Sequence, residues 1–143
     1  MLKATSNTDA SWCPHTGAGG WAAWIALDGG KRVKHSGRFH KLAESSNQAE
    51  LWAILNGLYL AAMNGAEHVL CQSDCQDALS RVNKRGHWGP DVKQLVKQFP
   101  KLRVVRTKWV KGHKLDGSAR AWVNDWADKT AKGHMLEQRN LLR

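Results

Sequence analysis

Four acidic positions in this sequence could act together as ligands of a metal ion. Asp9 stands in NTDAS, Glu50 in NQAELWAIL, and Asp74 closes the run HVLCQSD. The fourth position is Asp125 or Asp128, which stand three residues apart in VNDWADK. Clustered carboxylates repel one another unless a cation lies among them, and their hard oxygen atoms suit Mg²⁺ or Mn²⁺. Two such ions could activate a water molecule and stabilise the leaving oxygen when a phosphodiester is cleaved.

Each of these acids also has an ordinary structural explanation. Asp9 could be a turn residue, Glu50 an acid favoured near the start of a helix, and Asp74 an N-cap. Asp128 could be a solvated partner of Lys132. Asp9, Glu50 and Asp74, however, fall at the ends or starts of predicted elements, and ligands of open α/β sheets gather at the carboxyl ends of strands and the adjoining helix starts. Asp125 and Asp128 lie on the last predicted helix. Their number therefore favours a common site.

The elements that position the acids follow from hydrophobic periodicity and turn residues. Strands are predicted over residues 19–27, 32–40, 67–74 and 101–113, with the turn DGGK joining the first two into a hairpin. Helices are predicted over residues 47–65, 75–86, 90–100 and 118–133, and the tail HMLEQRNLLR could be either helical or frayed. Glu50 falls in the first turn of its predicted helix, and Ser73 or Asp74 could cap the next. If the polar N-terminal run LKATSNTDAS is also a strand, the order is β-β-β-α-β-α-α-β-α, a mixed sheet flanked by helices.

Composition limits the classes of protein that the chain could represent. Its 143 residues fit one compact domain, and 22 Lys and Arg against 12 acids give a net charge of +10. This charge favours a polyanionic partner, most simply nucleic acid. Cys13, Cys71 and Cys75 form no CxxC pair, which disfavours structural zinc and disulfides. No apolar run approaches the roughly 18 residues of a membrane span, so we expect a soluble, cytoplasmic protein without a membrane partner.

Five motifs, in the order TDAS, NQAEL, SD, KWVKGH and NDWADKTA, resemble ribonuclease H of type 1 over roughly residues 3–133. The resemblance implies an RNase H-like α/β fold for residues 1–143, with a five-stranded mixed sheet flanked by helices. The short connection between Asp74 and His113 leaves little room for the basic protrusion that some relatives carry. The resemblance also implies a monomer or a domain of a larger polymerase-type protein.

The activity that the resemblance implies is endonucleolytic cleavage of the RNA strand of an RNA–DNA hybrid. Two Mg²⁺ ions, with Mn²⁺ as an alternative, would be the cofactors, and the products would carry 5′-phosphate and 3′-hydroxyl ends. Asp9, Glu50 and Asp74 match the first three metal-binding acids of the family. Asn124 followed by Asp128 matches its fourth motif, which selects Asp128 over Asp125, and His113 matches a loop histidine that helps to move protons or release product. The connection before Asp128 is longer than in most relatives, so Asp125 stays open as an alternative.

Substrate-binding residues are less directly indicated than the acids. Asn47 and Gln48 take the place of polar residues that contact the hybrid in the family, and Ala10 stands where many relatives have glycine. Trp88 and Lys108 add an aromatic and a charged side chain, although Trp88 could equally pack against the following helix. The candidate substrate-binding residues are Ala10, Asn47, Gln48, Lys84, Arg85, Lys111 and Asn124.

Two other functions fit the same sequence. The first is a DNA nuclease of the same fold, of the resolvase or transposase type. The second is a non-catalytic nucleic-acid-binding domain that keeps the fold and the charge. Comparing cleavage of hybrid with cleavage of duplex DNA separates the first, and Asp74→Asn separates the second because it removes a metal ligand and leaves the basic surface.

Overall fold

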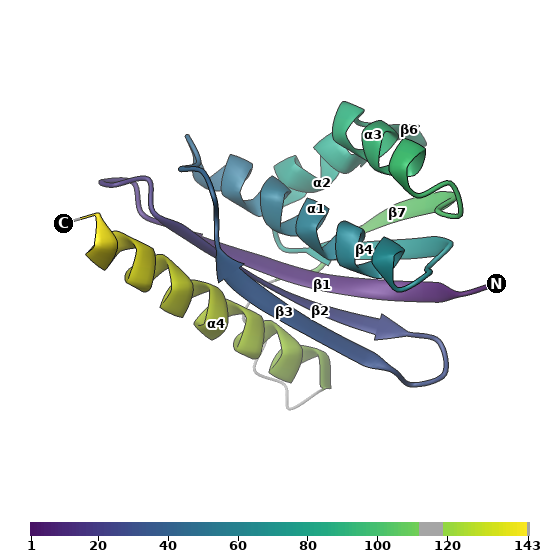
Figure 1. Ribbon diagram of the computed structural model, residues 1–143, viewed down its shortest axis with the longest axis horizontal. Coiled ribbons are helices and arrows are strands. Elements are labelled where there is room, and N and C mark those ends of the chain that lie inside the picture. Colours follow the sequence, from purple (N-terminus) through teal and green to yellow (C-terminus); the bar gives the residue numbers. More distant parts are fainter. Residues whose placement is uncertain (112–118, 143) are drawn as a thin grey trace.

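A five-stranded mixed sheet forms the centre of the computed structural model, which describes residues 1–111 and 119–142. The strands are β1 (Lys3–Trp12), β2 (Gly19–Leu27), β3 (Arg32–Arg38), β4 (His68–Ser73) and β7 (Val104–Trp109). They lie in the order β3-β2-β1-β4-β7 (Figure 1). The first three strands pair antiparallel, whereas β1 with β4 and β4 with β7 pair parallel. The predicted sheet is confirmed, including the strand in the polar N-terminal run.

Helices cover the two faces of the sheet unequally. The helices are α1 (Ser46–Met63), α2 (Gln76–Val82), α3 (Pro90–Gln98) and α4 (Ala119–Leu141). Figure 1 shows α1, α2 and α3 on one face and α4 alone on the other. The main core lies under α1, where Ile54 and Leu58 pack against Ile25 of β2 and Val69 of β4. Burial of these apolar side chains supplies most of the driving force for this arrangement.

Strand β1 is central although its residues are mostly polar. Ser6 and Thr8 face α1 and are almost fully buried. They are tolerated because α1 carries Gly57 at this contact, where an added Cβ would lie 2.7 Å from Thr8 Cγ2 and would also meet Ser6 Oγ. The missing side chain lets the helix backbone approach the strand closely. The position of the strand therefore depends on a glycine far away in the sequence.

Helix α4 continues past Gly133 to Leu141. Of the two alternatives for the C-terminal tail, helical or frayed, the helical one is therefore correct. Beyond Gly133, the Met135 side chain is buried. Gln138 bonds to the backbone at two places: Gly19 N, at the start of β2, donates to its Oε1 at 2.6 Å, and its Nε2 donates to Phe39 O, just after β3, at 2.9 Å. These contacts outweigh the weak helix propensity of a single glycine.

The segment predicted as one helix over residues 75–86 contains a helix and a small hairpin. Helix α2 begins after Cys75 and ends at Val82, and strands β5 (Asn83–Lys84) and β6 (His87–Trp88) follow. Arg85 and Gly86 form the two-residue turn with φ of 53° and 84°, as a type I′ turn requires. The suggested caps are also wrong, because Cys75 is the N-cap residue; Ser73 Oγ instead accepts a hydrogen bond from Cys75 N at 3.1 Å.

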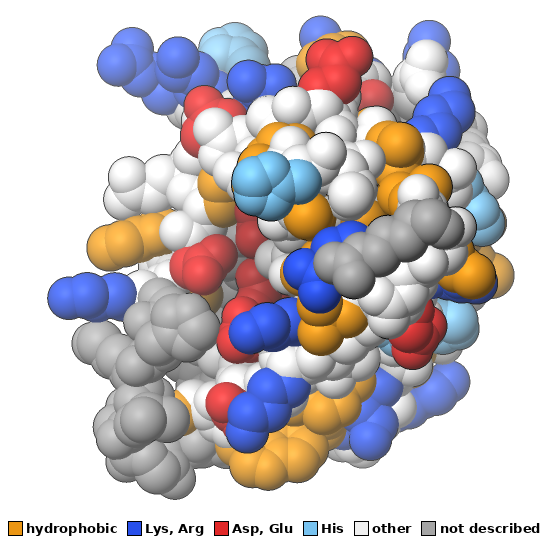
Figure 2. Space-filling model, turned by 90° about the vertical axis from the view of Figure 1, so that its left-hand side faces the viewer, with side chains coloured by type: hydrophobic (Ala, Val, Ile, Leu, Met, Phe, Trp, Pro, Cys, Tyr) orange, Lys and Arg blue, Asp and Glu red, His pale blue; other side chains and the backbone are white. Residues whose placement is uncertain are grey.

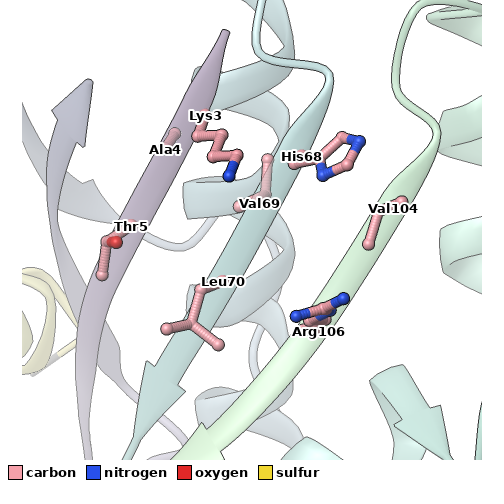
Figure 3. A pocket seen from close by; sticks show the side chains of 8 residues that line it. All are labelled: Lys3, Ala4, Thr5, His68, Val69, Leu70, Val104 and Arg106. Atoms are coloured by element: carbon pink, nitrogen blue, oxygen red, sulfur yellow. The ribbon is translucent and has the colours of Figure 1, made fainter. Parts of the chain in front are cut away.

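Among the described residues, no helix covers part of the sheet face that carries α4. Helix α4 packs on β1, β2 and β3, and Figure 3 shows the remaining surface over β1, β4 and β7. Its shallow hollow, of about 380 Å³, is lined by Lys3, Ala4, Thr5, His68, Val69, Leu70, Val104 and Arg106. In the described part of the chain, no helix is both long enough and apolar enough to span a membrane.

Candidate active site

Three of the predicted acids meet at one end of the sheet. Asn7 of β1 lies opposite Gln72 of the parallel strand β4, so Asp9 and Asp74, each two residues further on, reach the same edge. The Glu50 side chain extends from α1 toward the same two acids. One carboxylate oxygen from each of Asp9, Glu50 and Asp74 lies within 4.8 Å of the other two. Parallel pairing of β1 with β4 is what brings together acids that are so far apart in the sequence.

Local hydrogen bonds fix Glu50 relative to Asp9. Ala10 N donates to Asp9 Oδ1 at 2.9 Å and to Glu50 Oε1 at 3.3 Å, so one backbone N–H contacts both carboxylates.

Glu50 is the fifth residue of α1, so its predicted place in the first turn is wrong. The helix starts at Ser46 because Ser45 Oγ accepts from Gln48 N at 3.1 Å while Gln48 Oε1 accepts from Glu44 N at 2.7 Å. This is a variant of the capping box in which the glutamine bonds to the residue before the N-cap.

The acidic cluster is electrostatically strained without a cation. Burial, then the neighbouring charges of Asp74 and Asp128, raises the pKa of Asp9 to about 7. Burial and the charges of Asp9 and Asp74 raise the pKa of Glu50 still further above its usual range. Glu50 Oε2 is buried and has no hydrogen-bond partner in the described part of the chain. Carboxylate oxygen atoms that lie this close together, one of them buried without a hydrogen-bond partner, fit a hard divalent cation.

Helix α4 places the two aspartates of VNDWADK differently. The charge of Asp128 acts on Asp9, so Asp128 lies on the side of α4 that faces the cluster. It does not belong to the group of three whose oxygens lie within 4.8 Å. Asp125 forms an exposed ion pair with Lys129 at 3.0 Å. Asn124 lies one turn before Asp128 on the same face of the helix.

The other predicted residues lie around or away from this cluster. Asn47 lies at its edge, where Cys75 Sγ donates to Asn47 Oδ1 at 3.5 Å. Lys84 and Arg85 belong to the β5–β6 hairpin, which packs beside α2 and β7. Lys111 is exposed just after β7, and His113 lies outside the described residues.

One residue at the site was missed by the sequence reasoning. Trp109 Nε1 donates to the backbone carbonyl of Asp74 at 3.0 Å, which ties the end of β7 to the β4–α2 junction. The indole is also half-exposed, with 49% of the residue accessible. Its place in KWVKGH was visible, but nothing in that motif indicates a bond to another strand end.

The surface around the cluster carries both negative and positive side chains. Figure 2 looks onto the left-hand end of Figure 1 and shows a recess lined with acidic side chains, with Lys and Arg side chains around it. An acidic recess could hold cations while the basic surroundings contact phosphates.

A mixed five-stranded sheet with acids meeting where β1 and β4 end defines an RNase H-like domain. Residues 7–113 match the sequence model of a family described as reverse transcriptase-like, so the chain belongs to this family of RNase H-like domains. A comparison with curated proteins finds no significant match.

Solved structures agree with the family assignment. The chain is similar to the N-terminal RNase H domain of a Mycobacterium tuberculosis protein, solved as a fusion with maltose-binding protein, at 22% identity and a TM-score of 0.66 over 100% of both chains. It is also similar to RNase H1 from the halophilic archaeon Halobacterium salinarum, at 17% identity and a TM-score of 0.67, over 94% of this chain and 98% of the other. At these identities the likeness establishes the fold.

Proposed function

We propose that residues 1–143 form a metal-dependent endoribonuclease domain that hydrolyses the RNA strand of RNA–DNA hybrids. The observation that carries this proposal is the meeting of Asp9, Glu50 and Asp74 within 4.8 Å at the end of parallel strands. The buried, unpaired Glu50 Oε2 supports it, because a cation would supply the missing partner. The family membership and the basic surface favour a nucleic acid as the substrate.

Asp9, Glu50, Asp74 and Asp128 would hold the metal ions, two Mg²⁺ or alternatively Mn²⁺. When bound, these ions supply an activated water and stabilisation of the departing 3′ oxygen, which yields 5′-phosphate and 3′-hydroxyl ends. The Ala10 N–H keeps two of the carboxylates in place before any ion arrives. Preorganised ligands of this kind lower the cost of binding.

The remaining candidate residues would bind the hybrid. Asn47 and Asn124 have amide groups able to contact ribose hydroxyls, and the Ala10 backbone would lie against the substrate. The NH₂ group of Gln48 stays available, since the capping box uses only its carbonyl oxygen. Lys84, Arg85 and Lys111 would contact phosphates, and His113 would assist proton movement or product release. Contacts to 2′-hydroxyls and duplex shape, without base-edge readout, predict low sequence specificity.

Cleavage assays test this proposal directly. The protein is incubated with labelled RNA–DNA hybrid, duplex DNA or duplex RNA, in Mg²⁺ and again in EDTA. We expect cleavage of the RNA strand of the hybrid alone, and only with metal. Asp74→Asn should abolish cleavage and retain hybrid binding, because the basic surface is unchanged. Preference for duplex DNA would point to a DNA nuclease of the same fold, and binding of the hybrid without cleavage in Mg²⁺ would point to a non-catalytic domain.

A further inference from the structure

A second pocket lies at the edge of the sheet, between β3 and α1. Its volume is about 470 Å³, within the range of small-molecule sites. The lining residues are Trp21, His35, Ser36, Gly37, Arg38, Phe39, His40, Lys41, Trp52 and Asn56. Strand β3 is an edge strand of the sheet (Figure 1), so the pocket opens at the side of the molecule.

Aromatic rings form the inner part of this pocket. Trp21 and His35 are stacked, with ring centroids 6.1 Å apart and planes 9° from parallel. Phe39 and Trp52 meet edge to face at 5.5 Å. Gly37 leaves space beside Trp21, since an added Cβ would lie 3.4 Å from Trp21 Nε1. Phe39 is buried beneath Trp52, whereas Trp21, His35 and Trp52 are at least partly exposed and can stack with planar ligands.

Cationic side chains surround these rings. Arg38 and Lys41 are both exposed and bring two positive charges, and the imidazoles of His35 and His40 add hydrogen-bonding groups. None of the lining residues, all of which belong to the described chain, is acidic. The pocket therefore suits a ligand that is both planar and anionic.

The pocket is separate from the acidic cluster. Both use α1, but Trp52 follows Glu50 by two residues, which turns its side chain by about 200° around the helix axis. Trp52 and Asn56, one turn apart, then face the pocket, while Glu50 faces Asp9.

We infer that this pocket binds a nucleobase and its adjoining phosphate from a single-stranded stretch of nucleic acid. The rings supply stacking surfaces, and Arg38 with Lys41 neutralises phosphate charge. An acidic peptide would satisfy the cations but would leave the stacking surfaces unused. This binding requires neither the metal ions nor cleavage, so it goes beyond the proposed nuclease activity.

Binding of a fluorescein-labelled 12-nucleotide oligothymidylate to the whole chain in EDTA, followed by anisotropy, tests the inference. The double variant Arg38→Glu, Lys41→Glu should weaken binding at least about ten-fold. The matched control is Lys31→Glu, Arg32→Glu, an equal charge change in exposed residues at the other end of β3 and outside the pocket lining. Equal weakening in both double variants would overturn the inference, since it would reveal attraction by net charge alone.

The role of the rings needs its own measurement. Trp52→Leu removes an aromatic ring while it keeps an apolar side chain, and it should weaken oligothymidylate binding about ten-fold. Inorganic polyphosphate and polyglutamate are the anionic probes without bases. Competition by either one as strong as that by unlabelled oligothymidylate would contradict stacking, and an oligouridylate arm measures any preference for RNA.

Failure of this inference is distinguishable from failure of the nuclease proposal. Cleavage of a blunt hybrid in Mg²⁺ reports on the acidic cluster, and we expect Arg38→Glu, Lys41→Glu to change its rate less than about two-fold. A protein that binds the single strand through the pocket but cuts no hybrid would refute the nuclease proposal alone.

Discussion

Asp128 and Asp125 stand on one helix turn but in different electrostatic surroundings. The charge of Asp128 acts on Asp9, whereas Asp125 is paired with Lys129 in solvent. We expect Asp128→Asn to lower the rate of hybrid cleavage in Mg²⁺ by at least about ten-fold, since even loss of a residue that supports a metal ligand typically costs about 10–100-fold. Asp125→Asn should retain the rate within about two-fold and change stability by less than about 0.5 kcal/mol. The reverse result would show that the wrong aspartate has been assigned to the site.

Glu50 destabilises the metal-free protein at neutral pH. Its pKa is raised above the unfolded value, so this group's contribution to stability is full below about pH 4 and is lost as pH rises toward the folded pKa. Glu50→Gln removes the ionisation, and we expect it to raise the free energy of unfolding in EDTA at pH 8 by on the order of 1–3 kcal/mol.

Thermal unfolding in EDTA at pH 4, 6 and 8 measures the effect of Glu50→Gln. The stabilisation should shrink toward zero at pH 4, where the wild-type carboxyl is protonated in both states. Mg²⁺ should raise the melting temperature of the wild type at pH 8 more than that of the variant. If the variant were less stable than the wild type at pH 8 in EDTA, the ionised Glu50 carboxylate would not be what destabilises the metal-free protein.

At the scale of elements, the contact of α1 with β1 controls where Glu50 lies. An alanine at Gly57 would press against Ser6 and against Thr8 Cγ2, 2.7 Å away, so these buried side chains or the helix itself must shift. Gly57→Ala should therefore destabilise the protein by about 1–3 kcal/mol, although alanine is normally the better helix former. It should also slow hybrid cleavage, because Glu50 moves with α1.

Gly133 supplies the matched control for Gly57. It lies inside α4, and no atom of a neighbouring residue in the described chain lies within 4 Å of the place that an added methyl group would take. Gly133→Ala should therefore stabilise the protein by about 0.5–1 kcal/mol. Chemical denaturation measures both variants. Equal effects of the two substitutions would mean that helix propensity, and not the close contact with β1, decides the outcome at Gly57.

These elements also show where sequence reasoning succeeds and where it stops. The hairpin of β2 and β3 was predictable because Asp28, Gly29 and Gly30 form a turn between alternating runs, and both glycines have positive φ. The strand β1 was uncertain, since its burial depends on a distant glycine. The true end of α4 depends on hydrogen bonds between Gln138 and the backbone of Gly19 and Phe39. The β5–β6 turn requires a positive φ at Arg85, and arginine is not a residue type that indicates such a conformation.

The site was predictable to a similar extent. The three acids Asp9, Glu50 and Asp74 follow from their places at the ends of elements, which the strand pairing brings to one edge. The bond from Trp109 to the Asp74 carbonyl was not predictable, because it joins residues that only the tertiary structure brings together.

At the scale of the whole molecule, the charge distribution combines attraction with local repulsion. The net charge of +10 favours encounter with any polyanion, whereas the acidic recess in Figure 2 would repel phosphates unless cations occupy it. Binding of the hybrid should therefore come mainly from the basic surroundings, and productive placement of a phosphodiester should need the metal ions.

Salt dependence measures how many basic residues contact phosphates. For Asp74→Asn, the logarithm of the association constant for the hybrid should fall linearly with the logarithm of the salt concentration, because the phosphates release counterions when the protein binds them. Adding Lys84→Gln and Arg85→Asn should reduce the slope by about 2 if both side chains contact phosphates. Asparagine is chosen because it tolerates the positive φ at Arg85, so the hairpin is retained. Lys31→Gln, Arg32→Gln at the β2–β3 turn is the control, and an equal drop in slope there would show that the β5–β6 hairpin contributes only general charge.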